Sequence, residues 1–260
     1  MANETGTPRL TDAQLVEMLD LAKEADSVEL KVTVPDRAQR SSVRALGIDP
    51  LDAQIRQVFF FDTPDLALDR AGVVVRARRI QGKGDDSTVK LRPVVPASLP
   101  AELRRSPSFV VEVDAMPGGF VCSGSLKGRP TPGDVKLAIA GEVPLRKLFS
   151  KDQRAYFGQH APEGISLDSL SVLGPIFVLK VAFVPEGYGR RLVGEVWLYP
   201  DGERVLELST RCLPSEALQV AGETRVFLTR RGIDLAGVQA TKTRTALQFF
   251  SKELRAAAEG

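Results

Sequence analysis

The feature that most constrains the fold of this chain is a regular alternation of apolar and fully charged residues along several short segments. In SVELKVTV (residues 27–34) every second residue is valine or leucine, and Glu29 and Lys31 lie between them. Successive side chains of a β-strand point to opposite faces, so the segment predicts a strand with one apolar and one charged face. A sheet of such strands needs an apolar layer on one side and water or a polar cavity on the other.

The same alternation recurs along the chain and predicts about eight strands with helices at the joins. A glycine- and proline-rich stretch, residues 117–133, is predicted to be an irregular loop. We therefore expect a single α+β domain with a barrel-like antiparallel sheet packed against helices. The segments predicted as strands are 27–34, 57–62, 71–80, 88–94, 109–115, 175–185, 190–200 and 203–212.

Net charge and cysteine content narrow the classes of partner and compartment. The 260 residues include 35 Lys and Arg against 33 Asp and Glu, a balance that argues against a general nucleic-acid coat. The two cysteines do not make a disulfide framework, which predicts a reduced, cytoplasmic protein. No run approaches 18 apolar residues and the polar start has no signal-peptide core, so neither a membrane span nor a membrane partner is expected.

Charged residues gather on one face of most predicted strands, and this face has two interpretations. In the first it is the outer wall of the barrel, which is the commoner arrangement for alternating strands. In the second the charges line a tunnel and helices cover the apolar faces. An outer wall usually mixes in Thr, Ser, Gln and Asn, whereas these doublets are fully charged and rich in Arg, which suits phosphate recognition. Composition by itself leaves both interpretations open. The residues of this face are Lys31, Arg76, Arg78, Lys90, Arg92, Lys180 and Arg211, with Glu29, Glu112, Asp114, Glu195 and Glu207.

Six sequence blocks resemble the CYTH superfamily, the triphosphate tunnel enzymes, and occur in that family's order. The longest is VFFFDTPDLALDRAGVVVRARR (58–79), an aromatic-Asp-Thr-Pro turn followed by an Arg-x-Arg strand. The resemblance implies a closed eight-stranded antiparallel β-tunnel surrounded by helices, here residues 27–257 after an N-terminal helical extension, residues 1–26. The other blocks, similar to the family's basic and acidic strands, are VELKV (28–32), TVKLR (88–92), VEVD (111–114), VLKVAF (178–183) and VLELS (205–209).

The resemblance also implies metal-dependent hydrolysis of a triphosphate-containing compound, inorganic or organic, with Mg²⁺ or Mn²⁺ as cofactor. The expected partner is a small triphosphate or polyphosphate rather than a nucleic-acid polymer. Cationic groups would hold the phosphate oxygens, carboxylates would hold the metal, and Glu29 and Lys31 would be catalytic, with Lys31 positioning or deprotonating the nucleophile. The implied metal ligands are Glu29, Glu112, Asp114 and Glu207, and the implied phosphate ligands are Arg76, Arg78, Lys90, Arg92, Lys180, Arg211 and Lys242.

Three positions depart from the family pattern. Ser27 and Ser209 stand where carboxylates are common, and Ala182 stands where a second basic residue is often found. Glu29 and Glu207 can still hold one ion together with the substrate, whereas the losses argue against a second, water-activating ion. Two alternatives to hydrolysis therefore stay open: adenylate cyclisation, and polyphosphate or nucleotide binding without catalysis. The sequence does not predict the oligomeric state.

Overall fold

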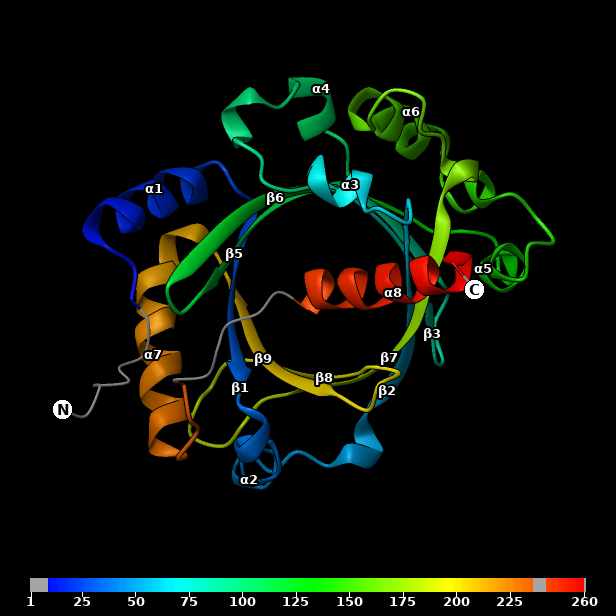
Figure 1. Cartoon of the computed structure of the whole chain (residues 1–260). Helices are drawn as coiled ribbons and strands as arrows, with labels where there is room; N and C mark the ends of the chain where they lie inside the picture. Colours follow the sequence, from blue (N-terminus) through cyan, green and yellow to red (C-terminus); the bar gives the residue numbers. More distant parts are fainter. Residues whose placement is uncertain (1–8, 236–241, 260) are drawn as a thin grey trace.

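Nine strands close on themselves to form a β-barrel at the centre of the structure (Figure 1). The computed structural model describes residues 9–235 and 242–259. The strands follow one another around the barrel in the order β1, β5, β6, β4, β3, β2, β7, β8 and β9, and β9 pairs again with β1. Their bounds are β1 Ser27–Val34, β2 Gln54–Asp62, β3 Val73–Ile80, β4 Asp86–Leu91, β5 Phe109–Met116, β6 Gly119–Gly128, β7 Ser171–Phe183, β8 Leu192–Leu198 and β9 Arg204–Cys212.

The expectation of eight antiparallel strands is wrong in two respects. The stretch predicted as a loop contains a ninth strand, β6, and β1 runs parallel to β5, so the barrel is mixed. Two glycines of β6 are required by packing rather than by turns: a Cβ on Gly124 would lie 2.7 Å from Cζ of Phe109, and one on Gly128 would lie 2.2 Å from Oε1 of Gln153. Glycine is ordinarily a turn signal and periodicity carries no strand direction, so neither feature could be read from the pattern.

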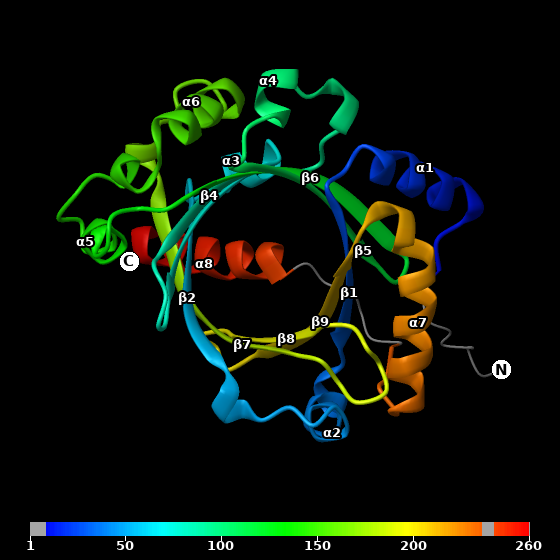
Figure 2. The same ribbon diagram turned by 180° about the vertical axis from the view of Figure 1, so that it is seen from behind.

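Helices such as α1, α2 and α7 lie on the outside of the barrel (Figure 2). α1 places Met18 and Ala22 in one buried cluster with Val28 of β1 and Val113 of β5. The charged faces therefore point inward, which is the second of the two interpretations. None of the described helices is long and apolar enough to cross a membrane. The helices are α1 Asp12–Lys23, α2 Gln39–Ala45, α3 Ala67–Arg70, α4 Ala101–Arg104, α5 Asp134–Ile139, α6 Lys151–His160, α7 Ala217–Arg230 and α8 Lys242–Glu259.

The Asp-Thr-Pro-Asp turn after β2 sets the path into the strand that carries the central arginines. The buried carboxylate of Asp62 accepts hydrogen bonds from the backbone N–H groups of Thr63, Leu68 and Asp69, at 2.7, 2.9 and 3.0 Å. These bonds satisfy amide groups at the start of the short helix α3. The chain then enters β3, which pairs with β2 on one side and β4 on the other and directs Arg76 into the barrel.

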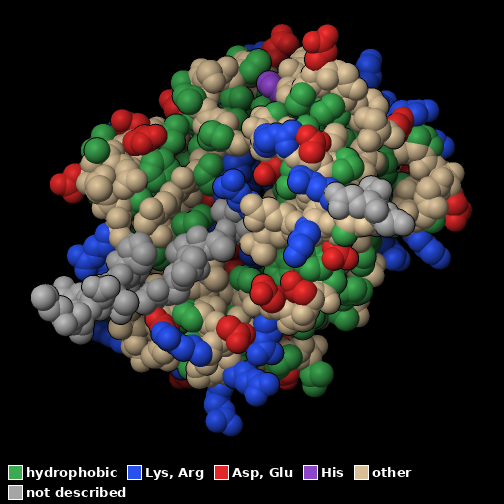
Figure 3. All heavy atoms as spheres, viewed as in Figure 1, with side chains coloured by type: hydrophobic (Ala, Val, Ile, Leu, Met, Phe, Trp, Pro, Cys, Tyr) green, Lys and Arg blue, Asp and Glu red, His purple; other side chains and the backbone are tan. Residues whose placement is uncertain are grey.

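The C-terminal helix α8 lies within the ring of strands in both ribbon views (Figures 1 and 2). Its Ala246 and Leu247 belong to one buried cluster with Phe60 of β2 and Trp197 of β8. The apolar face of α8 therefore packs against the inner side of these strands, and its first residue, Lys242, borders the barrel cavity. Figure 3, from the same side as Figure 1, shows Lys and Arg side chains near the middle of this face of the molecule.

Candidate functional site

A charged cavity of about 280 Å³ lies inside the barrel. Ten Lys and Arg side chains and five Asp and Glu side chains border it, an excess of five positive charges. Such an excess inside a protein wall attracts anions. All twelve residues to which the resemblance assigned a role border this cavity, and the roles themselves stay predictions. These residues are Glu29, Lys31, Arg76, Arg78, Lys90, Arg92, Glu112, Asp114, Lys180, Glu207, Arg211 and Lys242.

Three of the four carboxylates predicted to bind metal form a cluster on β1 and β5. One oxygen from each of Glu29, Glu112 and Asp114 lies within 4.8 Å of the others. Strand register explains the cluster, because Glu29 is paired with Asp114 across the parallel ladder and Glu112 lies two residues earlier on the same face. Carboxylate oxygens are the ligands that Mg²⁺ and Mn²⁺ prefer, so this donor set fits a hard divalent cation.

Lys31 bridges two members of the carboxylate cluster. Its Nζ lies 3.1 Å from Oε2 of Glu29 and 2.8 Å from Oδ1 of Asp114. Burial lowers the pKa of Lys31, but Asp114, Glu29 and Glu207 outweigh burial and hold the pKa above its ordinary value. A lysine with a raised pKa stays protonated at neutral pH. Its side chain is therefore suited to positioning an anion or a water molecule, and not to accepting a proton.

The three carboxylates differ in their affinity for protons. Burial raises the pKa of Asp114, but Lys31 and Lys90 outweigh burial and hold the value at about 2. Burial also raises the pKa of Glu29, but Lys31 and the other nearby cations leave it below its ordinary value. For Glu112, burial and the two neighbouring carboxylates raise the pKa together. Glu112 is thus the member of the cluster that is protonated first as the pH falls.

The fourth predicted metal ligand, Glu207, belongs to a separate group beside α8. Nζ of Lys242 lies 2.7 Å from Glu207 and 2.8 Å from Glu195, and Nζ of Lys180 lies 2.8 Å from Glu195. The Lys242 ammonium also lies 4.9 Å from the centroid of the Trp197 ring. Two lysines and two glutamates balance one another here. Glu207 therefore lies outside the three-carboxylate cluster, and both lysines are already paired with carboxylates.

The wall formed by β3 and β4 is basic. Arg76 has no ion-pair partner among the described residues, and its buried Nε has no hydrogen-bond partner. Burial and the neighbouring Arg78 lower the pKa of Arg76 to about 9, and burial lowers the pKa of Lys90 to about 8. Arg78 donates through Nε and Nη2 to Asp86. The pKa values of Arg76 and Lys90 are lowered because nearby carboxylates offset the effect of burial only in part, and a bound anion would raise both values again.

The serines that replace two family carboxylates bind the acidic residues that remain. The hydroxyl of Ser209 donates to Oε1 of Glu29 at 3.0 Å, and that of Ser27 donates to Oε2 of Glu112 at 3.3 Å. Arg211 contacts Glu112 and lies 3.9 Å from Glu29. The serines orient these carboxylates without adding negative charge, and Arg211 supplies a positive charge beside them.

Sequence analysis assigned no role to four charged or aromatic residues that border the cavity, namely Arg56, Lys127, Glu195 and Trp197. Arg56 was missed because β2 begins at residue 54, earlier than the predicted strand, and Lys127 was missed because β6 was predicted as a loop. The alternation in QIRQV (54–58) places Arg56 on the same face as Val58 and was a usable signal for Arg56. No such signal was available for Lys127, because the glycines of β6 indicated a loop.

A second cavity, of about 430 Å³, adjoins the barrel cavity where β3 ends, β4 begins and β6 ends. Both cavities are bordered by Arg78, Thr88 and Lys127. The second cavity adds Arg129, which is exposed, as Lys127 is. We call this cavity the basic mouth. It connects the interior of the barrel with the outer surface.

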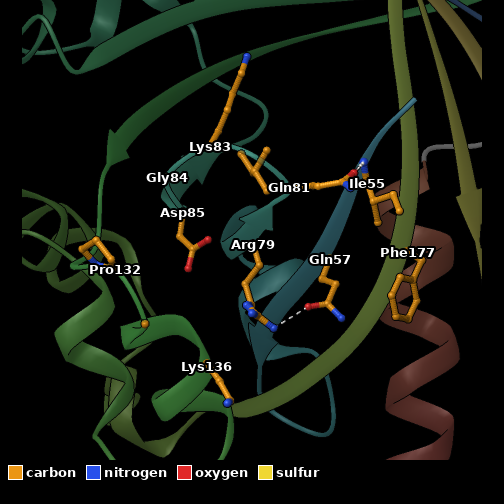
Figure 4. Close-up of a pocket in the computed structure, with 12 residues that line it drawn as sticks. Ile55, Gln57, Arg79, Gln81, Lys83, Gly84, Asp85, Pro132, Lys136 and Phe177 are labelled. Atoms are coloured by element: carbon orange, nitrogen blue, oxygen red, sulfur yellow. Dashed lines mark hydrogen bonds between the residues drawn. The ribbon is translucent and has the colours of Figure 1, made fainter. Parts of the chain in front are cut away.

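A groove of about 520 Å³ lies on the outer surface beside the β3–β4 hairpin (Figure 4). Arg79, which points to the opposite side of β3 from Arg78, donates through Nη1 to Oε1 of Gln57 at 2.9 Å. Lys83 and Lys136 also border the groove. A smaller cavity of about 400 Å³ shares Lys83 with this groove and Arg129 with the basic mouth.

Known structures share this fold, although no protein-family model and no curated protein matches the chain. One similar structure is a Hippeastrum protein described as a candidate adenylyl cyclase with a dominant triphosphatase activity. It has a TM-score of 0.62 and 18% identity over 84% of this chain and 93% of its own. Another is a candidate adenylate cyclase from Bacillus halodurans, with a TM-score of 0.58 and 14% identity over 85% of this chain and 97% of its own. The closed barrel with helices that the CYTH resemblance implied is thereby confirmed, although it has nine strands and is mixed rather than antiparallel.

Proposed function

We propose that the protein binds the triphosphate group of a small molecule in the barrel cavity and hydrolyses it with the help of a divalent cation. The observation that carries the proposal is the excess of five positive charges around the cavity, with Arg76 unpaired among the described residues. A triphosphate carries about four to five negative charges at neutral pH and would balance this excess. The descriptions of the two similar structures support the same class of substrate.

The basic wall is the part of the cavity best suited to hold phosphate oxygens. In this proposal Arg76, Arg78 and Lys90 donate to the phosphates, because all three face the cavity. Arg76 has no ion-pair partner among the described residues, whereas Arg78 is bound to Asp86 and Lys90 lies 3.7 Å from Asp114 in the free protein. Arg92, Lys180, Arg211 and Lys242 add positive potential, and each of them also has a carboxylate within 4.0 Å in the free protein.

The carboxylate cluster is the proposed metal site. Glu29, Glu112 and Asp114 would hold Mg²⁺ or Mn²⁺, which neutralises negative charge on the phosphate oxygens when it is bound. Lys31, which stays protonated, would position the attacking water. The water oxygen forms a bond to the terminal phosphorus as the bridging P–O bond breaks, so tripolyphosphate yields orthophosphate and pyrophosphate. Such a transfer depends on positioning and charge stabilisation more than on covalent chemistry.

Binding without catalysis is the second candidate function, and the state of the carboxylate cluster favours it. Ser27 and Ser209 halve the acidic pairs common in the family, and Lys31 and Arg211 already neutralise the cluster. A metal ion must compete with both cations. If it cannot, the cavity would retain a polyanion without cleaving it.

Product analysis distinguishes the candidate functions. The protein is incubated with tripolyphosphate and with ATP, in Mg²⁺ and in Mn²⁺, and the products are separated. Hydrolysis releases orthophosphate, cyclisation of ATP releases pyrophosphate with cyclic AMP, and a binding protein gives saturable calorimetric binding without product. Absence of both turnover and binding would refute the proposal.

Two arginines on opposite faces of β3 provide a matched control. Arg76→Gln is expected to weaken tripolyphosphate binding by about 1.5–3 kcal/mol, the scale of a hydrogen bond to a charged group. Arg79→Gln removes the same charge three residues away on the outer side and is expected to change the affinity little. Equal losses in the two variants, measured by calorimetry, would contradict binding inside the barrel.

A further inference from the structure

We propose that the substrate is a linear polyphosphate whose fourth and later phosphates leave the barrel through the basic mouth, beside Lys127, and bind Arg129 and then Lys83 on the outer surface. This inference rests on the proposed function, because it requires a triphosphate segment inside the barrel. It adds a binding surface outside the barrel and selects an inorganic chain over a triphosphate that carries an organic group.

The first support is the continuity of the two cavities. Arg78, Thr88 and Lys127 border both the barrel cavity and the basic mouth, so a thin ligand can extend from one into the other beside these side chains. Strand pairing brings them together, since Thr88 of β4 lies opposite Lys127 of β6 and opposite Arg76 of β3. The inner phosphate site and the mouth are thus adjacent parts of one wall.

The second support is unneutralised positive charge. Among the side chains that the structure describes, neither Lys127 nor Arg129 has a carboxylate within ion-pair distance. Asp86, the carboxylate that borders the mouth, is already bound to Arg78 through two hydrogen bonds. The mouth therefore offers two free cations to an anion that emerges from the barrel.

The third support is the absence of a surface for an organic group. Apart from charged residues, the described residues that border the basic mouth are small or polar, and none has an aromatic ring. They are Ser87, Thr88, Pro107, Ser108 and Gly128. Nucleobases and other heterocycles bind by stacking on rings or against apolar side chains. A nucleotide would find neither at this exit, whereas a phosphate chain needs only cations.

Further cations border the outer cavities that share residues with the basic mouth or with one another. The next cavity is bordered by Arg129 and Lys83, and the groove in Figure 4 by Lys83 and Lys136. Asp85 borders both of these cavities, and Asp86, which is bound to Arg78, also borders the first. Separate cations spaced along a surface suit an extended chain with one charge per repeating unit better than they suit a compact ligand.

Calorimetry with two inorganic ligands tests the proposal. Tripolyphosphate and a longer linear polyphosphate are titrated into three proteins at equal chain concentration and ionic strength. The proteins are the parent, a variant with Lys83→Gln and Arg129→Gln, and a control with Arg40→Gln and Lys147→Gln. The control removes two exposed cations that border none of these cavities. We expect the parent to bind the longer chain more tightly than tripolyphosphate. The Lys83/Arg129 variant should lose about tenfold in affinity for the longer chain and less than about threefold for tripolyphosphate.

The outcomes separate this inference from the proposed function. If the parent binds neither ligand, the proposed function fails and this inference fails with it. If tripolyphosphate binds but the Lys83/Arg129 variant and the control lose equal affinity for the longer chain, only this inference fails. A long chain could also bind more tightly only because it contains more triphosphate segments. In that case the Lys83/Arg129 variant and the control would have equal affinity for the longer chain, and this inference would be overturned.

Discussion

Replacing Asp114 by asparagine tests how far the cations of the cavity depend on one buried carboxylate. The Asp114 side chain is 2% exposed and lies 2.8 Å from Lys31, 3.7 Å from Lys90 and 3.9 Å from Arg92. Its pKa of about 2, against an ordinary 3.8, corresponds to about 2.5 kcal/mol of folding free energy at neutral pH. Removing one partner of a buried ion pair costs about 3–5 kcal/mol. We therefore expect Asp114→Asn to lower the free energy of unfolding by about 3 kcal/mol.

The sign of the pH dependence is fixed by the lowered pKa. A carboxyl whose pKa is depressed in the folded state contributes stability above its unfolded pKa and loses that contribution as the pH falls through its folded pKa. The difference between parent and Asp114→Asn should therefore be largest near pH 7 and smaller at pH 3. Tripolyphosphate without metal should stabilise the variant more than the parent, because it replaces the missing negative charge.

Urea denaturation in the presence of a chelator measures these effects, with Trp197, the single tryptophan, as the fluorescent reporter. Asp20→Asn is the control, since Asp20 forms an exposed ion pair with Lys23 and should change stability by less than about 1 kcal/mol. A loss below about 1 kcal/mol for Asp114→Asn, or a loss of the same size at pH 3 and pH 7, would refute the reasoning.

Two further predictions concern metal affinity and packing. The double variant Ser27→Glu/Ser209→Glu should be less stable than the parent without metal and should bind Mn²⁺ about tenfold more tightly by calorimetry. Its Tm should also rise more with Mn²⁺ than that of the parent, and an equal rise in Tm would contradict a metal at this cluster. Gly128→Ala should cost about 1–3 kcal/mol in urea denaturation, because its Cβ would meet the buried Gln153 amide. Gly158→Ala, with open space around it, should cost nothing, and equal losses in both would contradict the packing argument.

The inward-facing residues were the part of the site that could be predicted from sequence. Alternation along a strand depends on local backbone geometry alone, so Glu29 and Lys31, or Arg76 and Arg78, had to share a face wherever the strand was placed. The residues could not show whether that face was the inside of the barrel. The family resemblance supplied that answer, and helices such as α1 on the apolar faces agree with it.

Glycine and strand direction mark the limit of prediction for the fold. The glycines of β6 read as turn signals, yet two of them leave room for Phe109 and for Gln153. That requirement arises from side chains far away in the sequence. The parallel pairing of β1 with β5 is likewise a property of two distant segments, and neither segment alone encodes it.

The grouping of the charges was decided by tertiary structure. The family resemblance implied that Glu207 is a metal ligand, and register and the position of α8 pair it with Lys242 in the free structure. The same register brings Glu29, Glu112 and Asp114 together around Lys31. Local alternation determines which way a side chain points, because it depends on neighbouring residues. Which charge meets which across a cavity depends on strand order, register and helix docking, and only the folded chain sets these.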